Sequence, residues 1–165
     1  MADPVGDTFV DGTQRPITES RGDIVQTGAA YGPGGLTFSM QVHRPADPRQ
    51  DSRWSGDSTF ALWEADTNGD AVTDYEIQFY IDEGSFGGSV SRPGDPAGSS
   101  LCDVAATYGS DGYSVTIDPT CLGKPASFAY RATMYYDTNP KDENADVVSD
   151  VAPNGGLSFP VTSPG

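Results

Sequence analysis

The sequence predicts an all-β protein, an antiparallel β-sandwich of the jelly-roll or immunoglobulin-like type with about eight or more strands. Three observations predict this fold class. Hydrophobic residues alternate with polar ones over many short stretches, and no stretch keeps a helical period over three turns. Most of the 24 acidic residues are aspartate, which favours turns over helices, and 20 glycines and 13 prolines accompany them. The length of 165 residues suits one ordinary domain.

The individual strands are expected where the alternation is clearest. In "GGLTFSMQVH", Leu36, Phe38 and the next two alternate residues face one side of a strand, and the polar residues face the other. The stretches "DYEIQFYID", "GYSVTID" and "ASFAYRATMYYD" repeat this pattern. In chain order, the expected strands cover residues 24–31, 34–43, 59–64, 74–82, 101–108, 112–118, 126–137 and 156–161.

Two connections are longer than turns, at residues 44–57 and 137–150, and loops of this length in a compact domain are usually functional or mobile. We expect residues 1–160 to form a single module. We expect residues 161–165, "VTSPG", to begin a linker or tail, as in a module taken from a larger protein.

The net charge of −15 limits the possible partners. Such a negative field argues against nucleic acid and against anionic membranes, and no run of eighteen apolar residues predicts a membrane span. It suits divalent cations or a cationic protein partner. It is also typical of secreted proteins that stay soluble through an acidic surface.

The two cysteines predict one disulfide. Cys102 and Cys121 flank two strand-like stretches joined by the turn at residues 109–112. A hairpin centred there pairs residues whose numbers sum to about 221, which brings the two cysteines close enough to bridge. The bridge would imply an oxidising, extracellular location, so we expect a secreted protein. The alternative is two buried free thiols.

The stretch "DTNGDAVTDYE" predicts a Ca²⁺ site between two strands. Oxygen ligands recur at Asp66, Asn68, Asp70 and Asp74, with the carbonyl of Val72 in between. Ca²⁺ takes six to eight hard oxygen ligands, and carboxylates this close repel one another without a cation. The alternative is a plain turn, since Asn-Gly is a strong hairpin signal.

This stretch resembles the calcium loops of dockerins and thrombospondin type 3 repeats, and it departs from them twice. Ala71 stands at position six, where such loops hold glycine, and Ile77 stands at position twelve, where they hold a bidentate glutamate. These departures predict weaker binding or a ligand from elsewhere, such as Glu76 or Asp82.

A broader resemblance covers most of the chain. "DPVGD", "RGDI", "GGLTFSMQV" and "STFALWEADTNGDAVTDYEI" resemble the DOMON-like modules, which are similar to family-9 carbohydrate-binding modules. The resemblance implies a non-catalytic β-sandwich whose groove holds sugar and, in some relatives, a haem or a calcium ion. Asp3, Asp7 and Asp23 match the opening of the family pattern, where they cap turns or hold a second ion.

Several aromatic and basic residues are candidates for ligand binding. Trp54, in a polar loop, and Trp63, in an expected strand, offer rings for sugar stacking, and burial in the core is the alternative for each. Tyr80, Arg131 and Tyr135 fall on the outward sides of their strands and could complete a face that binds a glycan or cell-surface polymer. An ordinary exposed sheet face is the alternative.

We expect no enzyme. His43 is the single histidine, no GxSxG motif occurs, and the ligands for a zinc site are lacking. The leading hypothesis is a non-catalytic, calcium-stabilised accessory module of a secreted protein that binds carbohydrate or a surface. The alternatives are a protein-interaction or adhesin spacer module and a weak carboxylate-based glycosidase.

Overall fold

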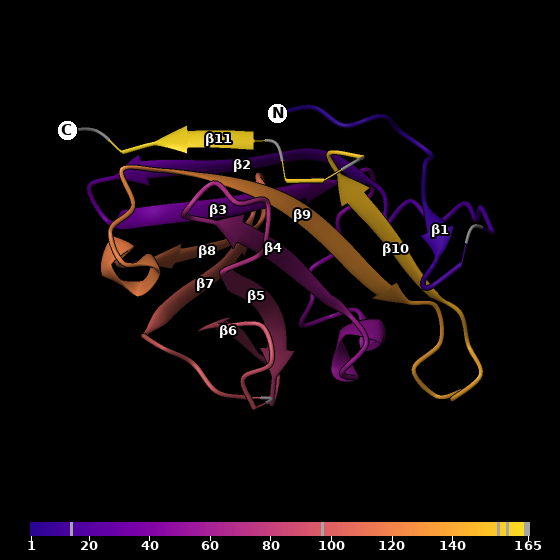
Figure 1. Ribbon diagram of the computed structural model, residues 1–165. Helices are drawn as coiled ribbons and strands as arrows, with labels where there is room; N and C mark the ends of the chain where they lie inside the picture. The colour runs from indigo at the N-terminus through magenta and orange to yellow at the C-terminus, as the bar shows by residue number, and fades with distance from the viewer. Residues whose placement is uncertain (14, 97, 155, 158, 164–165) are drawn as a thin grey trace.

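The computed structural model describes residues 1–165 except 14, 97, 155, 158 and 164–165. Within these residues, eleven strands form two antiparallel sheets that pack as the two layers of a sandwich (Figure 1). The predicted fold class, an all-β antiparallel sandwich, is confirmed.

The larger sheet has the strand order β1-β10-β9-β4-β5-β6, and β11 also pairs with β9. Its strands are β1 (Phe9–Val10), β4 (Phe60–Asp66), β5 (Tyr75–Asp82), β6 (Ser85–Ser91), β9 (Ser127–Asp137), β10 (Val147–Ala152) and β11 (Phe159–Thr162). The smaller sheet has the order β2-β3-β8-β7. Its strands are β2 (Ile24–Gly32), β3 (Gly35–Val42), β7 (Val104–Gly109) and β8 (Gly112–Ile117). Two short 3₁₀ helices, η1 (Ser52–Ser55) and η2 (Pro119–Leu122), lie between strands.

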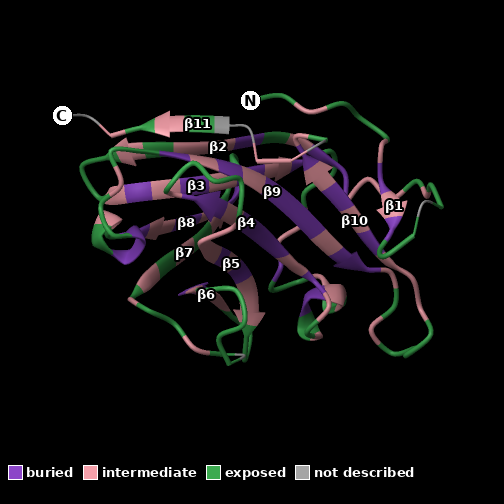
Figure 2. Ribbon diagram, viewed as in Figure 1, coloured by how far each residue is buried: buried purple, intermediate pink, exposed green. Residues whose placement is uncertain are grey.

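The core lies between the two sheets, where the alternating hydrophobic residues of each strand meet. Figure 2 shows buried stretches alternating with more exposed ones along β3, β4 and β9. Phe38 of the smaller sheet contacts the rings of Trp63 and Tyr130 in the larger one. Burying apolar area at roughly 25 cal/mol per Å² is the main driving force for this packing. The periodicity in the sequence therefore identified the core faces correctly.

Each of the eight predicted strands overlaps an observed strand, and three observed strands were not predicted. These are β1, β6 and β10. β6 has the sequence SFGGSVS, in which two glycines interrupt the alternation that would predict a strand. A Cβ at Gly88 would lie 2.5 Å from the Val104 side chain, so the packing favours glycine there. β10 begins inside residues 137–150, which we expected to be a long connection, so that expectation is wrong for residues 147–150.

The predicted hairpin and disulfide are both confirmed. Val104 pairs with Ile117 and Gly109 with Gly112, so the partners' numbers sum to 221. Cys102, just before β7, is bonded to Cys121 in η2, with 5.9 Å between the Cα atoms. The bridge closes a loop of 19 residues in sequence separation, which in the entropic account stabilises the fold by about 3 kcal/mol.

Both terminal segments pair with the sandwich. The carbonyl of Met1 accepts a hydrogen bond from the N–H of Thr27 at 3.0 Å. β11 continues to Thr162, so two residues of the expected tail pair with β9 instead. No helix in the described part of the chain has the length and apolar character needed to cross a bilayer.

Candidate functional site

Three aspartates from the N-terminal segment and β10 form what we call the N-terminal acidic cluster: Asp3, Asp7 and Asp150. Each offers one carboxylate oxygen, and these oxygens all lie within 4.8 Å of one another. Among the described residues, this is the group of three acidic, histidine or cysteine side chains that is compact enough to hold a metal ion. The sequence suggested a second ion at Asp3, Asp7 and Asp23, so two of these three residues belong to the observed cluster.

Backbone pairing brings the cluster together. The N–H of Asp3 donates to the carbonyl of Val25 at 3.0 Å, which fixes the N-terminal segment beside β2. β1 lies beside β10 (Figure 1) and pairs with it in register Phe9↔Ser149, which brings Asp7 and Asp150 close. The burial pattern of β10 alternates, and Asp150 takes an inward position that is 1% exposed. A carboxylate on the core side of a strand is unusual and requires partners.

The hydrogen bonds within the N-terminal acidic cluster leave two oxygens unsatisfied. Asp150 accepts from the N–H of Ile24 at 2.7 Å and from the N–H of Val151 at 2.8 Å. Asp7 Oδ2 accepts from the Asn154 amide at 2.5 Å. Asp3 Oδ2 and Asp7 Oδ1, by contrast, are buried and have no hydrogen-bond partner among the described residues. Native proteins leave few buried polar atoms in this state.

Crowding of the carboxylates changes their acidity. Burial raises the pKa of Asp150 to about 8, with the charges of Asp7 and Asp3 adding to the rise and the Ile24 N–H opposing it. Burial, then the charges of Asp7 and Asp23, raise the pKa of Asp3 to about 6. Both shifts express the same physical fact, that negative charge in this cluster is costly without a compensating cation.

Asp23 lies next to the cluster and has a different role. It is almost fully buried, and its Oδ1 accepts the N–H of Gly6 at 3.0 Å. Its Oδ2 lies 3.5 Å from Nδ1 of His43. Asp23 therefore caps the turn of the N-terminal segment, one of the two roles that the resemblance implied for these residues.

The loop between β4 and β5, the first predicted calcium site, forms a chain of local hydrogen bonds. Asp66 is buried and accepts the backbone N–H groups of Asn68, Gly69 and Ala71, at 2.7–3.0 Å. Asp74 accepts the N–H and hydroxyl of Thr67 at 2.8 and 2.7 Å. These are the contacts of successive aspartate and asparagine turns, the alternative that the Asn-Gly pair suggested.

The remaining predicted ligands of this loop are exposed and bonded within the loop, where the Asn68 amide donates to Asp74 Oδ1 at 3.1 Å. Asn68 and Asp70 are exposed, and each accepts a backbone N–H two residues later, at 2.9 Å. Val72 is 62% exposed. The structure does not gather the loop's carboxylates into a compact group of three, in contrast to the N-terminal acidic cluster. Calcium in the loop stays a prediction.

The backbone of this loop nevertheless has the bend of a calcium loop. Ala71, at the position where such loops hold glycine, adopts a φ of 65° in the left-handed region. Its N–H donates to Asp66 Oδ2. For the pKa of Asp66, burial acts upward, but the backbone donors outweigh it and lower the pKa below its usual value.

The two tryptophans are core residues, so the expectation of sugar stacking at Trp54 and Trp63 is corrected. Trp63 is 0% and Trp54 is 1% exposed. Trp54 lies in η1 and packs its ring on Phe79 and Tyr113 at centroid distances of 5.6 and 4.9 Å. The sequence placed Trp54 in a polar loop, and nothing local indicated that the 3₁₀ turn directs its ring inward.

The three outward residues share one face of the larger sheet. Tyr135 stacks on Phe60 at 4.7 Å, and Arg131 forms a two-pronged ion pair with Glu64 on the neighbouring strand. Tyr80 lies over Gly87, where a Cβ would come within 2.4 Å of its ring. We call the surface formed by Tyr80, Arg131 and Tyr135 the outer aromatic face. All three residues are half-buried, and their predicted outward orientation is correct.

Comparison with protein-family models, with curated proteins and with solved structures gives no match. The resemblance to DOMON-like modules therefore stays a prediction. The function has to be inferred from the chemistry of the residues themselves.

Asp150 is the member of the N-terminal acidic cluster that sequence reasoning missed. The local signal was present in "VVSDVA", where Val148, Asp150 and Ala152 share one side of an alternating run. An aspartate at a core position of a strand indicates a partner or a ligand. The alternation was not recognised because residues 147–150 fall within the predicted connection at residues 137–150.

Proposed function

We propose that the chain is a non-catalytic module of a secreted protein whose fold is stabilised by Ca²⁺ at the N-terminal acidic cluster. One observation carries the proposal. Asp3, Asp7 and Asp150 converge with two buried carboxylate oxygens that no donor satisfies within the described residues. The disulfide supports an extracellular setting, where calcium is abundant and thiols oxidise.

The donor set fits a hard divalent cation. Carboxylate oxygens suit Ca²⁺, Mg²⁺ or Mn²⁺ rather than softer metals, and Ca²⁺ tolerates the irregular geometry of a site assembled from loop and strand. Asp3 Oδ2, Asp7 Oδ1 and the Asp150 carboxylate would hold it. The bound ion would neutralise the mutual repulsion of the three groups. It would also tie the N-terminal segment to β10 and stabilise the folded state by mass action.

Thermal unfolding with and without calcium tests this proposal. With calcium about 100-fold above its Kd, the Tm should rise by about 5–10 °C over the value in chelator. Asp7→Asn should remove most of that rise, because it deletes one charge and leaves the amide contact with Asn154 possible. Asp70→Asn is the matched control in the β4–β5 loop and should keep the rise.

The pattern among the variants separates the two acidic sites. If calcium stabilises the Asp7→Asn protein fully and the Asp70→Asn protein not at all, the ion belongs to the loop at Asp66, Asn68, Asp70, Val72 and Asp74. Coincident melts in calcium and chelator for the unmodified chain would refute a structural metal at either place.

A glycosidase is a weaker candidate for the same carboxylates. A raised pKa in a carboxyl group is typical of a catalytic acid. Here, however, Asp150 is 1% exposed and the free oxygens of Asp3 and Asp7 are buried, so a glycosidic oxygen has no access to them. Turnover of chromogenic glycosides that Asp150→Asn abolishes would overturn the non-catalytic proposal.

A second candidate function, carbohydrate binding, is favoured by the outer aromatic face. Half-buried tyrosines offer flat apolar surfaces, and the Arg131–Glu64 pair keeps polar groups beside them. Sugars present apolar C–H faces and hydroxyl groups, so this combination matches them.

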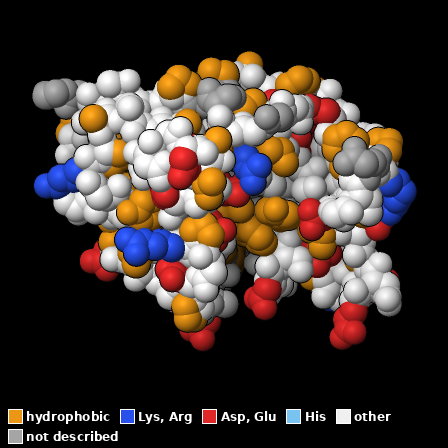
Figure 3. Space-filling model, viewed as in Figure 1, with side chains coloured by type: hydrophobic (Ala, Val, Ile, Leu, Met, Phe, Trp, Pro, Cys, Tyr) orange, Lys and Arg blue, Asp and Glu red, His pale blue; other side chains and the backbone are white. Residues whose placement is uncertain are grey.

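Affinity electrophoresis in glycan-containing gels tests the second candidate. Retardation by a glycan should be lost in Tyr135→Ala and kept in Tyr108→Ala, a control in β7 of the smaller sheet. If none of many glycans retards the protein, the alternative is favoured, a spacer or a module that contacts a cationic protein through its acidic surface. Figure 3 shows acidic side chains projecting at the lower edge of the visible face.

A further inference from the structure

A cavity of about 350 Å³ opens beside η1 and is separate from both acidic sites. Its lining includes two arginines, two aspartates and two neutral polar residues: Arg21, Asp47, Gln50, Asp51, Ser52 and Arg53. Its volume is at the lower end of the range for small-molecule sites and is sufficient for a single sugar ring.

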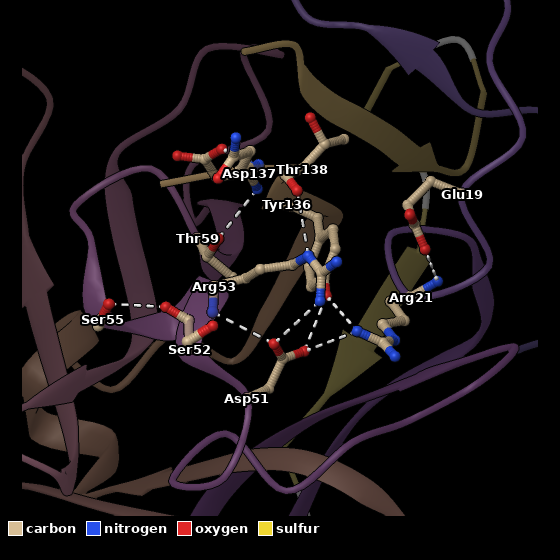
Figure 4. Close-up of polar contacts among 11 residues, drawn as sticks. Glu19, Arg21, Asp51, Ser52, Arg53, Ser55, Thr59, Tyr136, Asp137 and Thr138 are labelled. Atoms are coloured by element: carbon tan, nitrogen blue, oxygen red, sulfur yellow. Dashed lines mark hydrogen bonds and ion pairs between the residues drawn. The ribbon is translucent and has the colours of Figure 1, made fainter. Parts of the chain in front are cut away.

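Asp51 holds both guanidinium groups at the cavity (Figure 4). Its side chain is 6% exposed, and its oxygens lie 3.3 Å from Arg21 Nη1 and 3.5 Å from Arg53 Nη1. The Tyr136 hydroxyl donates to Asp51 Oδ2 at 2.8 Å and accepts from Arg21 Nη1 at 3.1 Å. Burial raises the pKa of Tyr136 to about 12, so the phenol keeps its proton. The two guanidinium groups are thus fixed in place before any ligand arrives.

Each guanidinium retains donors that the protein does not use. Arg53 Nε donates to the carbonyl of Thr138 at 3.2 Å. Within the described residues, Arg21 Nε, Arg21 Nη2 and Arg53 Nη2 make no hydrogen bond to the protein. The side chains of Arg21 and Arg53 are 40% and 36% exposed, so both arginines contact solvent as well as Asp51. A guanidinium presents its N–H groups in a planar fork that matches an oxyanion.

The charges of the lining balance, although the chain as a whole is strongly negative. The lining holds two guanidinium groups and two carboxylates, and both carboxylates are already paired, because Asp51 contacts Arg21 and Arg53, and Asp47 contacts Arg49 at 2.9 Å. A small anion therefore meets less repulsion here than the net charge of −15 predicts for the surface as a whole.

We propose that this cavity binds the anionic group of an acidic sugar, a carboxylate or a sulfate ester, between Arg21 and Arg53. Gln50 and Ser52 lie in the same lining and supply hydrogen bonds for the sugar hydroxyls. The inference depends on the carbohydrate-binding function proposed above and gives its ligand class. It places the charged group of the ligand at this cavity rather than at the outer aromatic face.

Calorimetric titration with sodium glucuronate, glucose 6-sulfate, glucose and sodium sulfate tests the inference. We expect at least one of the two acidic sugars to bind about tenfold more tightly than glucose. Arg21→Lys and Arg53→Lys should each weaken that binding about tenfold, since lysine keeps the charge opposite Asp51 but loses the planar fork. Arg15→Lys, whose arginine pairs with Asp146 away from this lining, is the matched control and should bind normally.

Three outcomes would overturn the inference. These are equal binding of glucose and both acidic sugars, acidic-sugar binding that survives both lysine substitutions, and binding of inorganic sulfate alone. Failure of the carbohydrate-binding function itself gives a different result, because then no glycan retards the protein in the gel assay. If a neutral glycan retards the protein and Tyr135→Ala abolishes that retardation, only the assignment of the cavity is wrong. The Tm of each variant shows that loss of binding does not reflect unfolding.

Discussion

The N-terminal acidic cluster and the β4–β5 loop are both rich in aspartate, yet their carboxylates have opposite surroundings. In the loop, each carboxylate accepts N–H groups from residues a few positions away, and Asp66 alone accepts three. In the N-terminal acidic cluster, the three carboxylates come from residues up to 147 positions apart, and two oxygens are buried without a donor among the residues that the structure describes. The loop satisfies its own charge, whereas the cluster does not.

This difference shows that an aspartate-rich segment can have either of two structural roles, capping a turn or contributing to a group of converging carboxylates. A regular spacing of oxygen ligands is visible in a sequence, but the same spacing also suits turns, because aspartate and asparagine cap nearby N–H groups. A convergence of carboxylates made by strand pairing leaves no local spacing to read. The electrostatic need for a cation is therefore greater where the sequence signal is weaker.

Their opposite pH dependence is the largest effect expected to distinguish the two regions. In the unfolded chain, Asp3 and Asp150 titrate near pH 4, whereas in the folded metal-free protein their pKa values are about 6 and about 8. The folded state binds the extra protons, so stability should fall as pH rises from about 4 to about 8. The Tm should drop by about 5 °C or more over this range.

A comparison of the unmodified chain with Asp150→Asn shows whether that pH dependence comes from the N-terminal acidic cluster. The groups facing Asp150 are Asp3, Asp7 and the N–H of Ile24, so an amide at this position removes the strongest titration and should flatten the slope between pH 6 and 8. Calcium should flatten the slope in the unmodified chain in the same way. An identical slope in the variant would assign the dependence to the general negative charge of the surface.

The fold could be predicted from the sequence because its information is local. Alternation along β3, β5, β8 and β9 identifies both the strands and their buried sides, and the β7–β8 turn fixes the disulfide register. What alternation could not supply is pairing between distant segments. β10 was hidden in an acidic stretch, and Trp54 is buried by the turn of η1 rather than by a strand.

The loop should respond most to the loss of Asp66, and independently of calcium at the N-terminal acidic cluster. Asp66→Ala leaves the N–H groups of Asn68, Gly69 and Ala71 without their acceptor, at a cost of about 2–3 kcal/mol in unfolding free energy. Because the backbone donors depress the pKa of Asp66, its contribution is present above about pH 4 and is lost as pH falls below that value. Urea unfolding at pH 7 measures the loss, and Asp70→Ala, at an exposed position, is the control.

Ala71→Gly gives the smallest effect and tests whether the loop is poised for an ion. Ala71 has a φ of 65°, a conformation that costs a residue with a Cβ about 1 kcal/mol and costs glycine almost nothing. The substitution should therefore raise the unfolding free energy by about 0.5–1 kcal/mol in chelator, as measured by urea denaturation. If the loop also binds Ca²⁺, the glycine should tighten that binding in a protein whose N-terminal acidic cluster carries Asp7→Asn. If the substitution raises stability and calcium does not change that gain, the loop is a turn held by its own hydrogen bonds. If stability does not rise at all, residue 71 does not adopt the left-handed conformation.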